Sequence, residues 1–121
     1  MEKLRFLKEE FKKHSLKEYP NEACGIITRD FKYIPCKNMS KDPINSFILD
    51  PLALLEYEDN CWGFFHSHPD EAPTPSILDG KKIADEEYTY LVGWEDDVFV
   101  YWYDKDIQST RFKKLQEEML S

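Results

Sequence analysis

Long apolar runs are missing from this sequence. No stretch approaches the roughly 18 consecutive apolar residues that a membrane-spanning helix needs, so we expect no such helix. The first residues mix charged and apolar side chains in the pattern of a surface helix, unlike the apolar centre of a secretory signal. We therefore expect the protein to remain in the cytoplasm where it is made.

Cysteine is scarce and its spacing is irregular. Cys24, Cys36 and Cys61 include no Cys-x-x-Cys pair, which argues against a disulfide framework and against a cysteine-rich zinc knuckle. Free cysteines behave as small apolar residues, so we expect all three to be reduced and buried.

Basic residues are outnumbered. The chain has 16 lysines and arginines against 24 acidic residues, which gives a formal net charge of −8. The pairs Lys12-Lys13 and Lys113-Lys114 fall in helical patterns and are too small to form a basic face. This balance argues against a nucleic-acid partner and favours a peptide or protein partner.

The residues that are present suffice for one globular domain. Hydrophobic residues make up 41% of the chain and aromatic residues 15%, so a packed core is expected rather than disorder. With 121 residues the chain has room for one such core and not for two. We therefore predict a single domain over residues 1–121.

Four helices are predicted from apolar spacing and capping residues. Leu4, Leu7 and Phe11 share one face of an opening helix over residues 3–15, near whose end His14 is expected to be exposed. The other three cover residues 50 to about 59, begun by Asp50 and Pro51; residues 76 to about 88, begun by Ser76; and residues from about 109, where Phe112, Leu115 and Met119 share a face.

Short apolar and β-branched stretches between these helices predict strands. They cover residues 23–28 and 31–36, joined as a hairpin by Arg29-Asp30, and then residues 47–49, 62–65, 90–94 and 98–103. Strands interspersed with helices in this order predict an α+β fold, with a mixed β-sheet flanked by helices.

Two of the three histidines lie two residues apart. His66 and His68 follow the apolar strand at residues 62–65, and Pro69 marks its end. Alternate residues of a strand face the same side of a sheet, so both imidazoles can reach one metal ion. A His-x-His pair alone is a weak signal, because two half-buried histidines bonded to backbone carbonyls would have the same pattern.

An acidic residue follows the histidines at the start of the next predicted helix. Ser76 and Asp79 have the spacing of a helix capping box, which is a routine start signal. Capping would also hold Asp79 rigidly, where it can serve as a third ligand. A catalytic zinc site has three protein ligands and one open position, so His66, His68 and Asp79 make a possible set.

A zinc hydrolase also needs a carboxylate that is not a ligand to move the proton of the attacking water. Four acids are candidates, namely Glu22, Glu56, Asp70 and Glu71. Glu22 opens a core strand after the turn at Pro20-Asn21, which would put it at a sheet end beside the histidines. These residues alone leave the choice open.

Together these motifs resemble the JAMM metalloprotease family, whose domain is also called the catalytic MPN domain. Every motif position is filled, with the spacing of that family: Pro20-Asn21-Glu22-Ala23-Cys24-Gly25, then His66-Ser67-His68-Pro69, then Ser76-Ile77-Leu78-Asp79, with Asp79 eleven residues after His68. The combination is specific, although each part alone is not.

The resemblance implies a role for each residue. His66, His68 and Asp79 would bind Zn²⁺, Glu22 would be the general acid and base, and Ser76 would stabilise the oxyanion. It also implies the JAMM/MPN fold, a compact cytidine-deaminase-like sheet with flanking helices. The deaminase signature His-x-Glu with Pro-Cys-x-x-Cys is absent, so deamination is not expected.

The middle of the chain is similar to the tail-assembly branch of that family. This similarity runs from Pro35-Cys36-Lys37-Asn38 through Phe47-Ile48-Leu49-Asp50-Pro51 to the histidine strand. It implies a metallopeptidase that cuts a peptide or isopeptide bond, with phage tail proteins as partners and the host cytoplasm or virion tail as its location. A free-standing prokaryotic protease for ubiquitin-like or sulfur-carrier proteins is the alternative.

Two other classes compete with a peptidase. A cupin-type metal protein also uses His-x-His, but it needs a later histidine and none follows His68. A metal-free MPN scaffold generally lacks the ligands, whereas this chain has all of them. A tail component whose structural role outweighs catalysis is still compatible with the sequence.

Substrate specificity would depend on the loops at the rim of the site. We expect residues 38–46 and 72–75 to form that rim. Trp62, Trp94 and Trp102 are expected to pack in the core rather than to bind substrate.

Overall fold

The computed structural model describes residues 2–70, 88–104, 106 and 108–114. Six strands form one sheet in the order β2-β1-β3-β4-β5-β6. They are β1 (Cys24–Ile27), β2 (Tyr33–Cys36), β3 (Gly63–Ser67), β4 (Thr89–Trp94), β5 (Asp97–Asp104) and β6 (Ser109–Lys114). β3 and β4 pair in parallel and all other neighbours are antiparallel. The predicted α+β class with a mixed sheet is confirmed.

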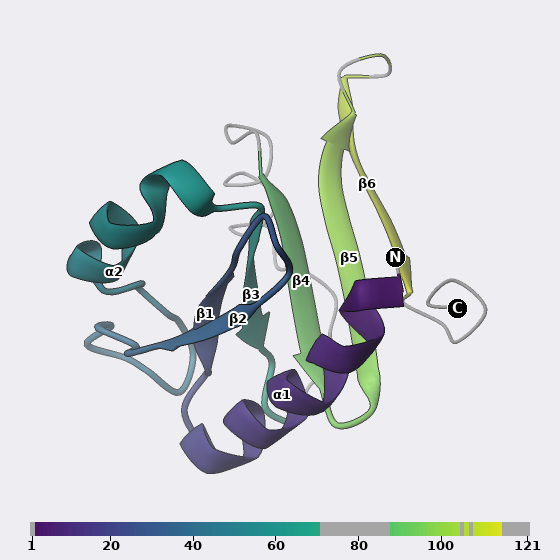
Figure 1. Cartoon of the computed structure of the whole chain (residues 1–121). Coiled ribbons are helices and arrows are strands. Elements are labelled where there is room, and N and C mark those ends of the chain that lie inside the picture. The colour runs from purple at the N-terminus through teal and green to yellow at the C-terminus, as the bar shows by residue number, and fades with distance from the viewer. Residues whose placement is uncertain (1, 71–87, 105, 107, 115–121) are drawn as a thin grey trace.

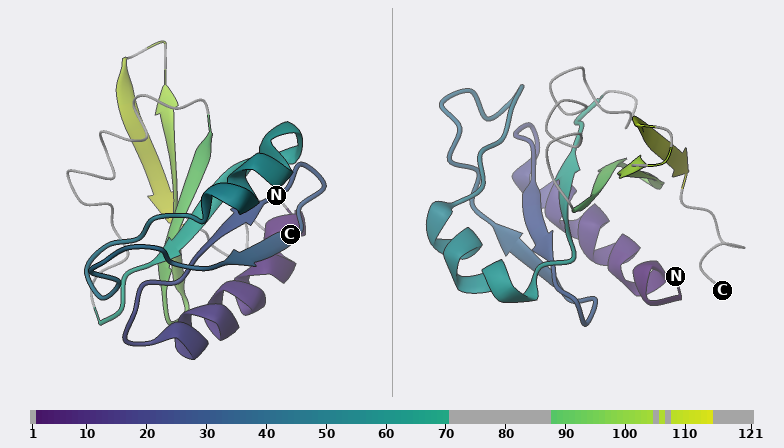
Figure 2. Two further views of the ribbon diagram at one scale, coloured as in Figure 1. Left: turned by 90° about the vertical axis from the view of Figure 1, so that its left-hand side faces the viewer. Right: turned by 90° about the horizontal axis from the view of Figure 1, so that it is seen from above.

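The helices lie on opposite faces of the sheet (Figures 1 and 2). α1 (Glu2–Glu18) packs Leu7 and Phe11 against one face, where the ring of Phe11 stacks on Phe65 at 4.3 Å between centroids. α2 (Pro51–Tyr57) continues as the 3₁₀-helix η1 (Glu58–Asn60) and flanks the other face. Ala53 and Tyr57 pack there against the second core cluster, which includes Ile26, Phe64 and Val92.

Several local predictions are confirmed. The side chain of Asp50 caps α2 by accepting a hydrogen bond from the amide of Leu52, with Pro51 as the first helical residue. β1 and β2 form the predicted hairpin. All three cysteines are buried and free. No helix among the described residues has the length and apolar character needed to cross a bilayer.

The predicted strand at residues 47–49 is wrong. In the structure the segment contributes only an isolated bridge between Asn38 and Leu49. Its backbone is held mainly by the side chain of Asn38, which accepts a hydrogen bond from the amide of Ile48. The apolar pattern of residues 47–49 gives no sign that the side chain of Asn38, rather than a neighbouring strand, supplies the hydrogen bonds.

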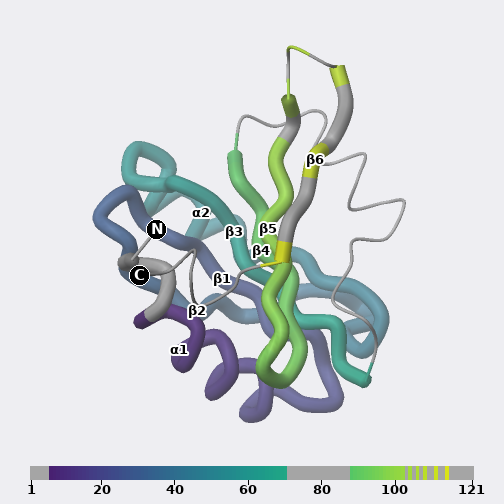
Figure 3. Tube along the Cα trace, turned by 90° about the vertical axis from the view of Figure 1, so that its right-hand side faces the viewer, coloured from purple at the N-terminus to yellow at the C-terminus, as the bar shows by residue number. Residues whose placement is uncertain are grey.

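The helix predicted from about residue 109 is wrong over residues 109–114, and its later part, with Leu115 and Met119, lies outside the described residues. Residues 109–114 form β6, which pairs with β5 from Ser109 opposite Asp104 to Lys114 opposite Phe99. The side chain of Asp104 accepts a hydrogen bond from the amide of Asp106 in the intervening turn. The backbone groups along the edge of the long strand β5 supply hydrogen-bond partners for a full strand. Strand pairing therefore outweighs the local helical spacing of the sequence. The resulting hairpin extends beyond the rest of the sheet (Figures 1 and 3).

His14 was expected to be exposed, and that prediction is wrong. Its side chain is 8% exposed, and its Nδ1 lies 2.7 Å from the hydroxyl oxygen of Tyr33 on β2. α1 packs across the β1–β2 hairpin, so the late helical position faces the protein rather than solvent. The predicted helix over residues 76–88 falls almost wholly outside the described residues.

Gly63 is required where β3 approaches β4. A Cβ atom built there would collide with the carbonyl oxygen of Thr89, which belongs to the backbone of the neighbouring strand. Backbone atoms cannot move aside as the end of a flexible side chain can. The parallel pair that carries the histidines therefore depends on this glycine.

Candidate metal centre

The register of β1 and β3 brings the predicted residues together. Cys24 lies opposite His66, so Glu22, just before β1, lies near His68, just after β3. The amide of Ser67 donates to the carbonyl of Ala23 at 2.9 Å, and the amide of Ala23 donates to the hydroxyl of Ser67 at 2.8 Å. These bonds join the two strands between the acid and the histidines.

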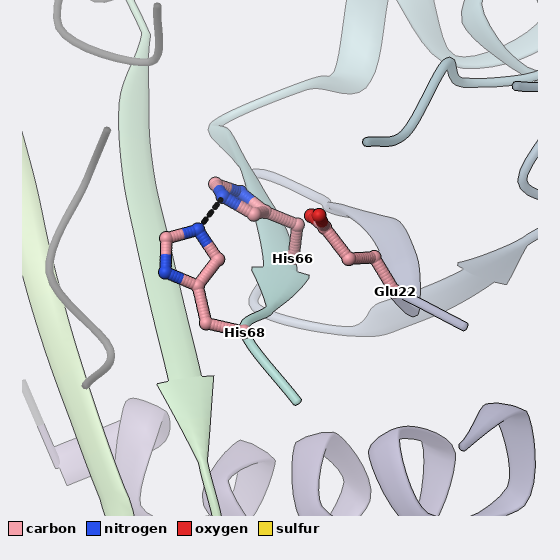
Figure 4. Close-up of side chains that lie close together, drawn as sticks. All are labelled: Glu22, His66 and His68. Atoms are coloured by element: carbon pink, nitrogen blue, oxygen red, sulfur yellow. Dashed lines mark hydrogen bonds between the residues drawn. The ribbon is translucent and has the colours of Figure 1, made fainter. Parts of the chain in front are cut away.

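Glu22, His66 and His68 form one buried cluster (Figure 4). One possible ligand atom from each lies within 4.8 Å of the others, and the side chains are only 7%, 2% and 8% exposed. The two imidazoles approach each other through their Nε2 atoms, which lie 3.2 Å apart. Ionisable groups gathered in the interior are costly unless they share a proton or a cation.

The donor set and its spacing fit a zinc ion. Imidazole nitrogen and carboxylate oxygen are ligands that Zn²⁺ prefers, and two nitrogens bound at about 2.0–2.1 Å in tetrahedral geometry lie about 3.3 Å apart. The distance of 3.2 Å between Nε2 of His66 and Nε2 of His68 agrees with this value. The structure thus supports metal binding by the histidines, with Glu22 within reach as either a ligand or a base.

The other candidate acids are in different places. Asp70 accepts a hydrogen bond from the hydroxyl of Tyr19 at 2.5 Å and is exposed. Glu56 is exposed on α2. Glu71 lies outside the described residues, as do Asp79 and Ser76, the predicted third ligand and oxyanion donor. Among the described candidates, Glu22 is the acid that joins the cluster.

An aromatic ring supports the first histidine. Phe47 stacks on the imidazole of His66, with centroids 4.4 Å apart and planes inclined by 25°. Sequence reasoning assigned Phe47 to a strand and missed this contact. The segment before it also reaches the site, because the amide of Glu22 donates to the carbonyl of Pro43 at 2.7 Å. The predicted rim loop at residues 38–46 thus lies beside Glu22, and residues 72–75 lie outside the described residues.

The thiol nearest the cluster in the sheet is neutral. Burial, with smaller contributions from Cys36, Glu18 and Glu22, raises the pKa of Cys24 to about 12. The side chain lies across from His66 in the β1–β3 register. At neutral pH this raised pKa keeps the thiol of Cys24 largely protonated.

An apolar cavity of about 600 Å³ adjoins the site. Phe47 lines this cavity and also stacks on His66, so this side chain lies between the cavity and the cluster of Glu22, His66 and His68. Its other lining residues come from the second face of the sheet, from α2 and η1, and from the segments next to these elements: Ile26, Ile48, Leu49, Pro51, Leu54, Leu55, Tyr57, Glu58, Cys61, Phe64, Tyr88 and Tyr90. Leu52 and Leu55 are exposed on α2, and Leu55 also lines the cavity.

The tryptophans pack against neighbouring rings and core side chains. Trp62 and Trp102 contact the core cluster that includes α1. Trp94 stacks on Tyr19 with ring centroids 5.5 Å apart. The expectation of packing is confirmed for Trp62 and Trp102, which are partly buried against that core.

Residues 6–113 match the family described as prokaryotic homologs of the JAB domain. The chain therefore belongs to this family, which confirms the resemblance seen in its motifs. The match covers most of α1, all of β1 to β5 and nearly all of β6, so the family assignment applies to the described sheet.

Three relatives share part of their length with this chain. The tail tip assembly protein K of Escherichia phage N15 is 41% identical over 103 residues, covering 79% of this chain and 39% of that protein. The desampylase of Haloferax volcanii is 31% identical over 86 residues, covering 60% and 62%. The probable TtuB-protein conjugate cleaving protease of Thermus thermophilus is 35% identical over 88 residues, covering 64% and 60%. The chain thus spans less than two thirds of each relative.

Solved structures share the fold. Protein DSY2949 from Desulfitobacterium hafniense has a TM-score of 0.69 and 25% identity, with 90% of this chain and 86% of that chain covered. A protein from Salinibacter ruber has a TM-score of 0.53 and 15% identity, with 89% and 85% covered. The same arrangement of strands and helices therefore occurs in bacterial proteins of similar length.

Proposed function

We propose that this protein is a zinc-dependent metallopeptidase of the JAMM type, which hydrolyses a peptide or isopeptide bond in a protein substrate. The observation that carries the proposal is the buried cluster of Glu22, His66 and His68. The family match and two relatives named as a desampylase and a conjugate-cleaving protease support a hydrolase.

In the proposed site His66, His68 and Asp79 hold Zn²⁺. The ion would supply the positive charge that activates a water molecule and polarises the scissile carbonyl. The approach of the Nε2 atoms of His66 and His68 to 3.2 Å supports the two histidines as ligands. Asp79 comes from the motif spacing, since it lies outside the described residues.

Glu22 is the proposed general acid and base. Its carboxylate lies within 4.8 Å of ligand atoms on both histidines, close enough to take a proton from the attacking water. It then delivers that proton to the leaving nitrogen, so that the amine departs neutral. Ser76 donates a hydrogen bond to the oxyanion, a contribution of about 3 kcal/mol for one such donor in other proteases.

The expected setting is phage tail assembly, in the host cytoplasm or the virion tail, with tail proteins as partners. The 41% identity to the tail tip assembly protein K supports it. A free-standing protease for ubiquitin-like or sulfur-carrier proteins is the alternative, supported by the names of the other two relatives. A third possibility is a tail component whose structural role outweighs its catalysis.

Metal content and hydrolysis in three variants test the chemistry. Purified protein should hold about one zinc per chain, the number a single three-ligand site would bind, and His66→Ala and Asp79→Ala should lose it. Glu22→Gln should retain zinc and lose hydrolysis, because the amide cannot accept the proton. Loss of zinc in Glu22→Gln would make Glu22 a ligand instead. Hydrolysis by Glu22→Gln at the parent rate would refute the role as base.

Two substrates separate the settings. The tail proteins encoded by neighbouring genes represent the first, and a ubiquitin-like protein joined through its carboxyl terminus to a lysine side chain represents the second. Cleavage of one and not the other identifies the branch. Tail assembly supported by zinc-loaded Glu22→Gln would favour the structural role.

A further inference from the structure

The side-chain amide of Asn38 makes contacts in several directions at once. Its Nδ2 donates to the carbonyl oxygens of Glu22 and Ser46, each at 3.0 Å, and lies 3.4 Å from the carbonyl oxygen of Pro43. Its Oδ1 accepts from the amides of Ser40 at 3.0 Å and Ile48 at 3.2 Å. One planar group therefore connects the residue before β1 with both ends of the segment that follows β2.

Two of these contacts flank Phe47. The carbonyl of Ser46 and the amide of Ile48 are the backbone groups on either side of this residue, and Asn38 binds both. The amide of Met39 donates to the carbonyl of Ile48 at 2.8 Å, which closes the segment. Because the backbone of Phe47 is held at both neighbours, its ring has a fixed approach to the imidazole of His66, on which it stacks.

A third contact holds Glu22. Asn38 binds the carbonyl of Glu22, while the amide of Glu22 donates to Pro43 in the same segment. The next amide, that of Ala23, is bound by Ser67. The backbone that carries the proposed base is thus held on both sides, and its carboxylate extends from a fixed point toward the histidines (Figure 4).

We propose that Asn38 is a positioning residue that couples the proposed base Glu22 to the ring of His66. The inference rests on the proposed peptidase function and deepens it. Asn38 supplies both donors and an acceptor at one place. Aspartate at this position would lose the donors and bring a charged oxygen toward three carbonyl oxygens, and alanine would lose every contact. If Asn38 only stabilised the loop, replacing it would lower the free energy of unfolding without changing how Glu22 and His66 lie relative to each other.

The variants are Asn38→Ala and Asn38→Asp, with Asn45→Ala as the matched control. Asn45 is in the same segment and is exposed, and its amide binds the carboxylate of Asp42 rather than Glu22 or the neighbours of Phe47. The control therefore removes an equivalent amide from the same loop. Asn38→Ser, which places one hydroxyl where the amide was, is used where the alanine variant does not fold.

The first measurement needs neither metal nor activity. In the metal-free protein the ring current of Phe47 shifts the carbon-bound protons of the His66 imidazole, and Phe47→Leu gives their position without it. In Asn38→Ala these NMR signals should move toward the Phe47→Leu position, and in Asn45→Ala they should stay. Unchanged signals in folded Asn38→Ala would overturn the proposal, whatever the substrate proves to be.

The second measurement uses the zinc-loaded protein and a cleaved substrate. Loss of a residue that orients catalytic groups typically costs about 10- to 100-fold in activity, so kcat of Asn38→Ala and Asn38→Asp should fall by that factor. KM should change less than kcat, because the proposal places the loss in the orientation of Glu22 and His66 rather than in contacts with bound substrate. A kcat equal to that of the parent would overturn the coupling. A parent protein without activity would refute the proposed function, while the NMR result would still decide whether Asn38 holds the ring of Phe47 against His66.

Discussion

The hydroxyl of Ser67 and the backbone of Ala23 form a reciprocal pair at the centre of the site. Ser67 donates through its amide and accepts through its hydroxyl, and its side chain is fully buried. The residue between the two histidines is thereby tied to the residue after Glu22. This contact fixes Glu22 relative to the two histidines, although Ala23 and Ser67 lie 44 residues apart in the sequence.

Ser67→Ala should destabilise the protein by about 1–3 kcal/mol, because it leaves the buried amide of Ala23 without its acceptor. Urea unfolding followed by circular dichroism measures the change. Ser67→Thr retains a hydroxyl and should lose less. Ser15→Ala is the matched control: Ser15 is also buried, but its hydroxyl donates to the carbonyl of Phe11 within α1, where the helix supplies another partner. An equal loss in both alanine variants would argue against the link.

Zinc should raise the melting temperature, because a ligand that binds only the folded state stabilises it. The gain is about 2.7 kcal/mol at a free concentration one hundred times Kd. Differential scanning calorimetry with zinc and then with a chelator measures the shift. His68→Ala should abolish it, whereas His14→Gln should retain it, since His14 is a buried histidine bonded to Tyr33 instead. A zinc-dependent shift that persists in His68→Ala would contradict the assignment of the ligands.

Stability should fall as the pH decreases through about 6.5, the ordinary pKa of histidine. Burial, opposed in part by Glu18, lowers the pKa of His14 below that value, so the unfolded chain binds a proton more readily than the folded chain. The contribution of His14 is therefore complete above pH 6.5 and is lost below it. The free energy of unfolding, measured with urea at about pH 7.5 and about pH 5.5, should differ less between the two pH values in His14→Gln than in the parent. Identical pH dependence in the two proteins would refute this role.

The cysteines should resist thiol reagents in the folded protein. Burial is the main cause that raises the pKa of Cys24 to about 12 and that of Cys36 to about 11, so neither forms much thiolate at neutral pH. Cys61 is also buried. Ellman's reagent should therefore react slowly with the native protein. After unfolding in guanidinium it should react with all three thiols. Rapid reaction of a native thiol would show that one of them is accessible.

Local signals in the sequence predicted much of the fold. The cap at Asp50, the hairpin of β1 and β2, and the apolar strand before the histidines each depend on neighbours in the chain. The mistakes share a different cause. The segment around Phe47 is organised by Asn38, β6 by the edge of β5, and His14 by Tyr33, and each partner is brought in by tertiary packing.

The candidate site was predicted from motif spacing rather than from local physics. Glu22 was one of four possible acids, and the resemblance selected it before the β1–β3 register placed it near His68. Asn38 and Ser67 were not predicted as supports. Their roles depend on which backbone groups lie opposite them, and a single sequence contains no signal for that.

The placement of the tryptophans makes the protein convenient for fluorescence. Trp62 and Trp102 pack with the core against α1, so their emission reports the integrity of that layer. Trp94 follows Gly93, whose carbonyl accepts the amide of His68 at 3.0 Å. Replacing Trp62 and Trp102 by phenylalanine would leave one indole beside the backbone of the histidine motif. Tryptophan emission of the parent protein can then follow unfolding, and the same emission of the variant that retains only Trp94 can follow metal binding.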